Sequence, residues 1–378
     1  MKFEELLKMM VEKEASDLFI SAGVPPTMKL LGKTIPITKQ ILTPEQAHKT
    51  VLSVMTEAQR KEFLTTHECN FAISAAGIGR FRVSAFFQRN FSGMVLRRIQ
   101  TDIPKLDDIG LPDTIKELSM IKRGLVFIVG ATGSGKSTSL AAMIGHRNQN
   151  SNGHIISIED PIEFIHQHQN CIITQREVGI DTESFEVGLK NTLRQAPDVI
   201  MIGEIRTREA MGHAIAFAET GHLCLATLHA NNANQAIDRI INFFPSESHN
   251  QILMDLSLNL KAIVAQQLIP TVDGKNRQPV IEILLNSPLM ADQIRTGEFH
   301  EIKALMTKSR ESGMQTFDQA LFDLYKANQI SYQDALAYAD SANDLRLMIK
   351  MDKNLDVDML SHGGKNLKLE SYDAGSSI

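Results

Sequence analysis

The stretch from residue 130 to residue 137 constrains what this chain can fold into more than any other, because it fits the phosphate-binding pattern G-x-x-x-x-G-K-[ST]. An apolar run at 125–129 precedes it and is typical of a buried strand, while residues 138–144 are typical of a helix. Strand, glycine loop and helix are the context that this pattern requires. The residues expected to cradle a phosphate chain are Gly130, Ala131, Thr132, Gly133, Ser134, Gly135, Lys136, Ser137 and Thr138.

The chemistry of this loop follows from its residue types. Glycines let the backbone wrap closely, so that successive N–H groups point at phosphate oxygens, and the helix N-terminus adds partial positive charge. Lys136 is placed to reach the β- and γ-phosphates, and the Ser137 hydroxyl is placed to ligate Mg²⁺. We therefore predict that the chain binds ATP with Mg²⁺. The alternative, a Gly/Ser-rich turn without a ligand, is disfavoured by an eight-residue match with the correct flanks.

Length and composition indicate a globular protein with two or more domains. The 378 residues are 43% hydrophobic and 22% charged, and the net charge is −5. This acidic balance argues against a nucleic-acid partner, because binding to nucleic acid depends on a basic surface. Cys69, Cys171 and Cys224 are sparse and form no C-x-x-C motif, so we predict buried thiols in a reducing compartment.

The N-terminus carries acidic residues where a signal peptide would be basic, and no apolar segment follows them. No window reaches the roughly 18 uninterrupted apolar residues that suggest a transmembrane segment. We therefore predict a cytoplasmic protein, or one held at a membrane only through partners.

Residues 1–100 are predicted to form a compact α+β domain. Helical spacing of apolar residues marks 2–14, and a capping box at Thr43 marks a second helix that runs to about residue 63. The segments expected to be strands are 17–20, 28–31, 34–37, 68–74, 80–87 and 93–99. Residues 101–112 contain two prolines and a glycine and are interpreted as a domain linker.

From residue 113 to residue 350 apolar strands alternate with helices, which predicts a parallel α/β sheet covered on both faces. The expected strands of this sheet are 125–129, 155–158, 171–174, 199–202 and 223–228. Beyond them we predict a helix over 250–269, a strand over 279–285 and mostly helix over 287–345. The polar end of the chain, 351–378, is predicted to be a disordered tail.

Acidic residues follow two of the predicted strands, at the edge of the sheet where α/β proteins bind ligands. Glu159, Asp160 and Glu163 follow one strand, and Glu204 follows the other. Phosphoryl transfer to water needs a metal that neutralises charge and a group that orients the nucleophile. Glu204 is placed like the Walker B acid, which holds Mg²⁺ through water. Glu163 is the better candidate for polarising the attacking water, with Glu159 and Asp160 as competitors; the alternative is a solvated or capping carboxylate.

A histidine follows a third strand. His229 comes directly after the strand 223–228 and either donates a hydrogen bond to the γ-phosphate or has a structural role. Spacing alone does not decide between these two interpretations. His166 and His168, separated by one residue in a polar stretch, are interpreted as non-ligands.

Further motifs resemble those of secretion ATPases. Residues 158–164 look like their Asp box, residues 221–230 look like their His box, and the Walker B segment carries a glutamate alone, as theirs does. With the P-loop, these motifs resemble the type IV pilus retraction ATPases, the PilT/PilU family of the secretion ATPase superfamily. Residues 193–204 and 340–347 resemble the PilU branch, and the resemblance extends to about residue 350.

The resemblance implies a RecA-like ATPase domain preceded by a PAS-like domain, a homo-hexameric ring, and ATP bound between the two domains. It implies that hydrolysis rotates these domains and drives pilus disassembly at the inner membrane. The expected partners are a PilT-type retraction ATPase and the pilus platform protein. By the same resemblance Glu163 is the catalytic base, Glu204 the Walker B acid and His229 a phosphate contact.

The resemblance also points to arginines in the N-terminal domain. Arg82 and Arg97 match the pair that related secretion ATPases bring onto the γ-phosphate, a role that suits the guanidinium fork. Arg98 competes with Arg97 for this role. The alternative for both members of the pair is an exposed arginine on a β-strand.

Two departures from the family pattern bear on function. The zinc-binding cysteine cluster of the pilus extension ATPases is missing, which favours a retraction-type member. The A-I-R-N-L-I-R segment that PilT needs for retraction reads L-M-A-D-Q-I-R at 289–295, so that only Ile294 and Arg295 survive. This favours an accessory motor beside a PilT-type motor and leaves open a nucleotide-binding adaptor with little hydrolysis of its own. The acidic balance disfavours a third reading, a nucleic-acid translocase.

Overall fold

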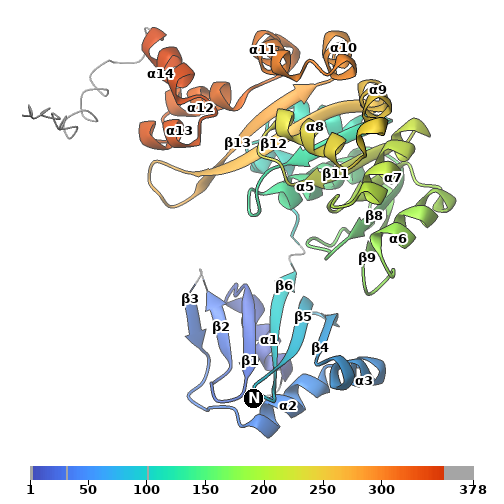
Figure 1. Ribbon diagram of the computed structural model, residues 1–378. Helices are drawn as coiled ribbons and strands as arrows, with labels where there is room; N and C mark the ends of the chain where they lie inside the picture. The colour runs from blue at the N-terminus through green and yellow to red at the C-terminus, as the bar shows by residue number, and fades with distance from the viewer. Residues whose placement is uncertain (1–2, 31–32, 100–101, 353–378) are drawn as a thin grey trace, which may run out of the picture.

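The computed structural model of this chain describes residues 3–30, 33–99 and 102–352, and it contains two separate β-sheets (Figure 1). All but the first two residues of the predicted tail, 351–378, lie outside the described residues, and so does residue 101 of the predicted linker. The remainder of the linker contains a short 3₁₀ turn, η1 (Leu106–Asp108), and is followed by helix α4 (Thr114–Met120), which precedes the second sheet.

The first sheet has six antiparallel strands in the order β3-β2-β1-β6-β5-β4. Its strands are β1 (Asp17–Ser21), β2 (Thr27–Leu30), β3 (Lys33–Pro36), β4 (Glu68–Ala75), β5 (Gly79–Gln88) and β6 (Phe91–Ile99). Helix α1 (Phe3–Glu12) buries one face, with Leu7 and Met10, in the core of this sheet. On β5 the core residue Phe81 alternates with Arg80 and Arg82, so both arginines face away from that core.

The single helix predicted to end near residue 63 is wrong, because the structure has two helices here, α2 (Pro44–Ser53) and α3 (Glu57–Thr66). The predicted start at Thr43 is confirmed, since its side chain accepts a hydrogen bond from the N–H of Gln46 in a complete capping box. Thr56 forms a second capping box with Gln59 and begins a new helix. The first helix ends at Ser53, and this capping box marks where the second one starts.

The second sheet has seven strands in the order β13-β12-β7-β11-β10-β8-β9. They are β7 (Gly124–Val129), β8 (Gly153–Glu159), β9 (Cys171–Glu177), β10 (Val199–Ile202), β11 (Leu223–Leu228), β12 (Leu260–Pro270) and β13 (Arg277–Leu285). All neighbours are parallel except β12 and β13, so the sheet is mixed. All five predicted strands and the expected strand over 279–285 are confirmed.

Helices cover both faces of this sheet, as predicted (Figure 1). Along β7, Leu125, Phe127 and Val129 belong to the core on one face, while Val126 and Ile128 belong to the core on the other. The first core is covered by α6 (Phe185–Thr192), α7 (Arg208–Glu219), α8 (Ala233–Asn242) and α9 (His249–Asn259). The second core is covered by α4 and α5 (Lys136–Asn150).

The helix predicted over 250–269 is half wrong. Helix α9 ends at Asn259, and residues 260–270 form β12, a central strand between β7 and β13. The strand is buried on both sides along most of its length, so its apolar run has no alternation that would separate it from a buried helix. Pairing with two neighbouring strands, which is tertiary information, decided the outcome.

Residues 287–352 are mostly helical, as predicted for 287–345. Its helices are α10 (Pro288–Thr296), α11 (Ile302–Lys308), α12 (Phe317–Lys326), α13 (Tyr332–Tyr338) and α14 (Ala342–Met351). They gather at the end of the molecule farthest from the N-terminal sheet (Figure 1). Cys69, Cys171 and Cys224 are buried and form no disulfide, as predicted.

Candidate active site

The glycine loop connects β7 to α5 and can fold only because of its glycines. Gly130 and Gly135 have φ angles of +155° and +90°, in the region that residues with a side chain rarely adopt. A Cβ atom on Gly130 would lie 2.5 Å from the carbonyl oxygen of Gln266. A Cβ atom on Gly135 would lie 2.7 Å from the side-chain Nε2 atom of the same glutamine. Gln266, on β12, also accepts a hydrogen bond from Ser139 at 2.7 Å and so fixes the first turn of α5 to the sheet.

Lys136 is buried at the start of α5 and its ammonium group faces the loop. Its Nζ atom donates to the carbonyl oxygens of Gly130, at 2.8 Å, and Ala131, at 2.9 Å. Burial lowers the pKa of Lys136, and the carboxylates of Glu204 and Glu163 oppose that shift. The predicted acids therefore lie close enough to act electrostatically on the lysine of the loop.

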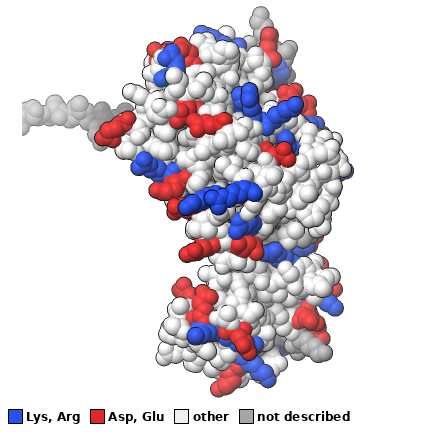
Figure 2. Space-filling model, turned by 90° about the vertical axis from the view of Figure 1, so that its right-hand side faces the viewer, with Lys and Arg blue, Asp and Glu red and all other residues white. Residues whose placement is uncertain are grey.

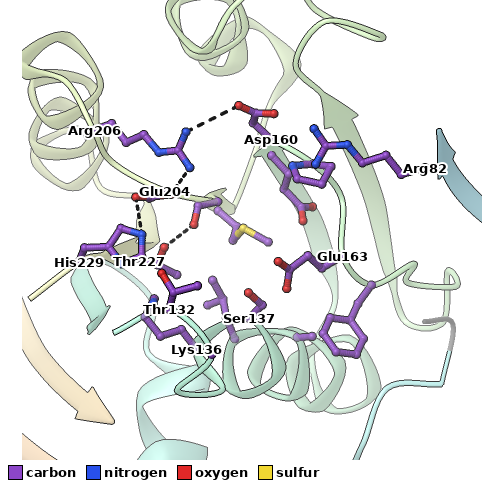
Figure 3. Close-up of a pocket in the computed structure, with 18 of the residues that line it drawn as sticks. Arg82, Thr132, Lys136, Ser137, Asp160, Glu163, Glu204, Arg206, Thr227 and His229 are labelled. Atoms are coloured by element: carbon purple, nitrogen blue, oxygen red, sulfur yellow. Dashed lines mark hydrogen bonds and ion pairs between the residues drawn. The ribbon is translucent and has the colours of Figure 1, made fainter. Parts of the chain in front are cut away.

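A cleft of about 350 Å³ opens above the loop and collects residues from several strand ends (Figure 3). It is lined by the loop and α5, by the segment after β8, by the residues that follow β10 and β11, and by Arg82 of the N-terminal sheet. Parallel pairing brings these strand ends to one edge, since β10 lies between β8 and β11. The predicted residues in this cleft are Thr132, Gly133, Lys136, Ser137, Glu163, Glu204, His229 and Arg82.

Glu204 is held between two cationic or polar side chains. Its Oε1 atom lies 2.9 Å from Nε2 of His229, and its Oε2 atom lies 2.6 Å from Nη2 of Arg206. Arg206 also approaches Asp160, with Nη1 4.0 Å from Oδ2. Sequence reasoning missed Arg206, although its position two residues after Glu204, past the strand end, was a signal.

The structure separates the three acids that follow β8. Glu159 is buried, and its Oε1 atom accepts hydrogen bonds from Ser157 at 2.6 Å and from Gln175 at 3.1 Å. Burial raises the pKa of Glu159 to about 7. Glu163 is exposed instead and points into the cleft beside Ser137 (Figure 3). This geometry favours Glu163 over Glu159 as the carboxylate that contacts a water molecule in the cleft. Asp160 is turned toward Arg206 instead.

The two predicted arginines take different positions. Arg82 and Arg97 lie directly opposite each other on β5 and β6, but only Arg82 lines the cleft. The Nε atom of Arg97 donates to Oδ1 of Asp17 at 2.9 Å, and its side chain is 70% exposed. Arg98 reaches toward the carbonyl oxygen of Val11 at 3.5 Å.

His166, which was not predicted as a site residue, lines the same cleft. It is buried, and burial lowers its pKa to about 4, so that its ring is neutral near pH 7. His168 accepts a hydrogen bond from the N–H of Ile173 at 3.1 Å through Nδ1. The interpretation of these histidines as non-ligands stays a prediction.

The residues present fit a magnesium ion that is bound mainly through phosphates and water. Ser137 and Glu204 both line the cleft and offer the hard oxygen atoms that Mg²⁺ prefers. Within the described residues no group of three or more His, Cys, Asp or Glu side chains is arranged to hold a metal ion. This is compatible with Mg²⁺, which usually takes only one or two protein carboxylates.

Together, a glycine loop between a buried strand and a helix, acids beyond the neighbouring strand ends and a mixed α/β sheet define a P-loop ATPase with a RecA-like fold. A family model described as "Type II/IV secretion system protein" matches residues 4–366. The Type IV pilus ATPase PilU of Pseudomonas aeruginosa is 70% identical over 373 residues, which cover 99% of this chain and 98% of that protein. The chain therefore belongs to the type II/IV secretion system protein family and, within it, to the pilus-associated ATPases of the PilT/PilU type.

Two further comparisons support the same family assignment. The Type IV pilus retraction ATPase PilT of Pseudomonas aeruginosa is 37% identical over 335 residues, which cover 89% of this chain and 97% of that protein. The crystal structure of the pilus retraction motor PilT with bound ADP superimposes with a TM-score of 0.87 and 38% identity, covering 92% of this chain and all of that one. The predicted fold class, family and ATPase activity are confirmed. Within the described residues, no helix is long and apolar enough to cross a bilayer.

Proposed function

We propose that this chain is the subunit of a homo-hexameric ATP-hydrolysing motor that powers type IV pilus retraction as an accessory to a PilT-type motor. One observation carries the proposal: a single cleft joins the P-loop, acids from two strand ends and Arg82 from the other sheet. A ligand that fills this cleft contacts both domains. Its hydrolysis can therefore change how the domains sit relative to each other.

The arrangement of clefts around the loop supports ATP as that ligand. Glu163 and Glu204 line the first cleft, so the γ-phosphate belongs there and the nucleoside must leave the loop on its other side. On that side a second surface cleft of about 400 Å³ is lined by Gly135, Thr138 and other residues. Its apolar and cationic side chains include Leu111, Leu268 and Arg277, which suit the two faces of a flat base.

In this mechanism the protein mainly positions charge. Glu163 accepts a hydrogen bond from the attacking water and takes its proton as water bonds to the γ-phosphorus and the bond to ADP breaks. Lys136 and Arg82 neutralise the charge on the phosphate oxygens. Ser137 and Glu204 would hold Mg²⁺, which when bound neutralises further phosphate charge. His229, placed beside Glu204, donates a hydrogen bond to the γ-phosphate and responds to its loss.

Rotation follows from the position of Arg82. A triphosphate attracts this arginine toward the second sheet, and loss of the γ-phosphate weakens that attraction. In a ring, each subunit would thus change shape as it hydrolyses. We expect the ring to act on the cytoplasmic side of the inner membrane, bound to the pilus platform protein. The kinship with the type IV pilus ATPases PilU and PilT supports a place beside the pilus.

A nucleotide-binding adaptor is the second candidate, and helix α10 bears on it. Of the two residues that survive from the PilT segment, Ile294 is fully buried and Arg295 forms an ion pair with Asp292. Both residues thus make contacts within the fold, which favours an adaptor in which α10 itself does not drive retraction. Nucleic-acid translocation gains no support, because Lys and Arg are interspersed with Asp and Glu on the face shown in Figure 2.

The proposal is tested by ATP turnover and by motility. The purified protein should release phosphate from Mg²⁺-ATP, Lys136→Ala should abolish release, and Lys308→Ala, which changes an exposed lysine far from the loop, should not. In cells that contain the PilT-type motor, Glu204→Gln should reduce twitching. Normal twitching with Glu204→Gln would instead favour the adaptor, and equal phosphate release from Lys136→Ala would contradict the assigned site.

A further inference from the structure

Glu177 holds the backbone of the segment that carries Glu163. It is the last residue of β9 and is buried, with 3% of its surface exposed. Its Oε2 atom accepts a hydrogen bond at 3.3 Å from the backbone N–H of Ile162, the residue directly before Glu163. Its own N–H donates to Oδ2 of Asp181 at 2.9 Å, which fixes Glu177 in a turn. A buried, locally fixed carboxylate therefore sets the place of the proposed catalytic base.

The same oxygen atom of Glu177 is also approached from the other sheet. The Nη2 atom of Arg80 lies 3.7 Å from Oε2 of Glu177. Arg80 is on β5, two residues before Arg82, and side chains two apart on a strand face the same way. One strand of the N-terminal sheet thus sends one arginine into the cleft and another to the carboxylate that supports Glu163.

This contact is a poor stabiliser, which favours a functional role for it. The Nε atom of Arg80 is buried and has no hydrogen-bond partner in the described structure. Leaving such a group unpaired destabilises the fold, and buried ion pairs are weak contributors to stability in general. Burial raises the pKa of Glu177, while the N–H of Ile162 and the charges of Arg80 and Arg82 oppose this shift.

We propose that Arg80 and Glu177 are positioning residues that couple the placement of the N-terminal domain to the placement of Glu163. When the N-terminal sheet sits as in this structure, Arg80 compensates the buried charge of Glu177, and Glu177 holds Ile162 and with it Glu163. When the N-terminal sheet rotates away, Glu177 loses its cationic partner Arg80. Glu177 then holds the backbone of Ile162, and with it Glu163, less firmly. Hydrolysis is then fastest in one domain arrangement. This inference rests on the proposed role of Glu163.

A double-mutant cycle tests the coupling. Arg80→Gln and Glu177→Gln should each lower kcat for ATP about 10-fold, because a small displacement of a catalytic group costs up to about 100-fold, while KM stays within about twofold. The double variant should be no slower than the slower single variant. Arg80→Lys should recover part of kcat. The control Arg89→Gln changes an exposed arginine at the end of the same strand pair and should match the wild type. The coupling would be overturned if the two single losses in kcat multiplied in the double variant, or if Arg89→Gln lost as much kcat as Arg80→Gln.

Amide hydrogen exchange tests the positioning without any need for hydrolysis. In protein free of nucleotide, Glu177→Ala should speed exchange of the Ile162 N–H at least about 10-fold, since the acceptor is lost. Glu177→Gln retains an acceptor oxygen but loses the charge that faces Arg80, so it should speed this exchange by only about threefold; it also carries the test if Glu177→Ala fails to fold. Unchanged exchange in either folded variant, or equal acceleration in both, refutes the assignment. If the two variants show this exchange pattern but the wild-type protein does not turn over ATP, the proposed function is refuted and the positioning role of Glu177 is not.

Discussion

His229 and Glu204 lie 2.9 Å apart, Nε2 to Oε1, although 24 residues and the whole of α7 separate them in the chain. Each follows one of two neighbouring parallel strands, β11 and β10. The contact places an imidazole ring against the carboxylate that we propose as the Walker B acid, beside the proposed sites of the metal and the γ-phosphate.

His229→Ala should therefore impair hydrolysis more than nucleotide binding. Removal of a donor that acts mainly in the transition state costs on the order of 100-fold in kcat. We expect a loss of this size in steady-state phosphate release, with ADP affinity by calorimetry changed less than about threefold. A variant with full turnover would mean that His229 has only a structural role.

Glu163 and Glu159 should differ sharply when each is made neutral. Glu163→Gln removes the proposed base and should lower kcat on the order of 100-fold or more, since general base catalysis contributes about 10²–10⁴-fold. Glu159→Gln changes a buried carboxyl that is bonded to Ser157 and Gln175, and should keep hydrolysis within a few-fold. Single-turnover kinetics with saturating ATP separates the two. The reverse order of effects would transfer the base role to Glu159.

Arg82 should matter more than Arg97. Arg82 lines the cleft, so Arg82→Ala removes a cation from the phosphates and should reduce kcat on the order of 100-fold. Arg97 would have to release Asp17 to reach a phosphate, so Arg97→Ala should cost much less. Phosphate release by both variants at one protein concentration gives the comparison. Equal losses would show that Arg97 leaves Asp17 during turnover, as the family resemblance implies.

The stability of the protein should depend on pH through Glu159. Burial raises the pKa of this carboxyl from 4.5 to about 7, so the folded state binds its proton more tightly than the unfolded chain does. This stabilisation is complete below pH 4.5 and is lost as the pH rises to 7. At 1.36 kcal/mol per pKa unit the loss is about 3 kcal/mol.

Glu159→Gln should therefore be more stable relative to the wild type at pH 8 than at pH 5. Urea unfolding of both proteins at the two pH values measures the difference in the free energy of unfolding. Glu183→Gln, which changes an exposed carboxylate, serves as the control. Its difference in unfolding free energy from the wild type should change little between pH 5 and pH 8. A gap that does not widen between pH 5 and pH 8 would mean that Glu159 titrates near its ordinary pKa.

Local sequence determined the elements whose signals are local. The P-loop, its flanking strand and helix, and the helix start at Thr43 depend on residues within a few positions of each other. The edge of the sheet where the acids meet was also predictable, because parallel strands carry their carboxyl ends to one side. For this reason Glu163, Glu204 and His229 could be named before any coordinates were known.

Tertiary structure decided whatever depends on a distant partner. Residues 260–270 form a strand only because β7 and β13 lie on either side of them. Pairing with Asp17 turns Arg97 away from the cleft, while its neighbour across the strands, Arg82, enters it. Burial and bonds to Ser157 and Gln175 set Glu159 apart from Glu163. These features depend on contacts with residues far away in the sequence, so no local sequence pattern predicts them.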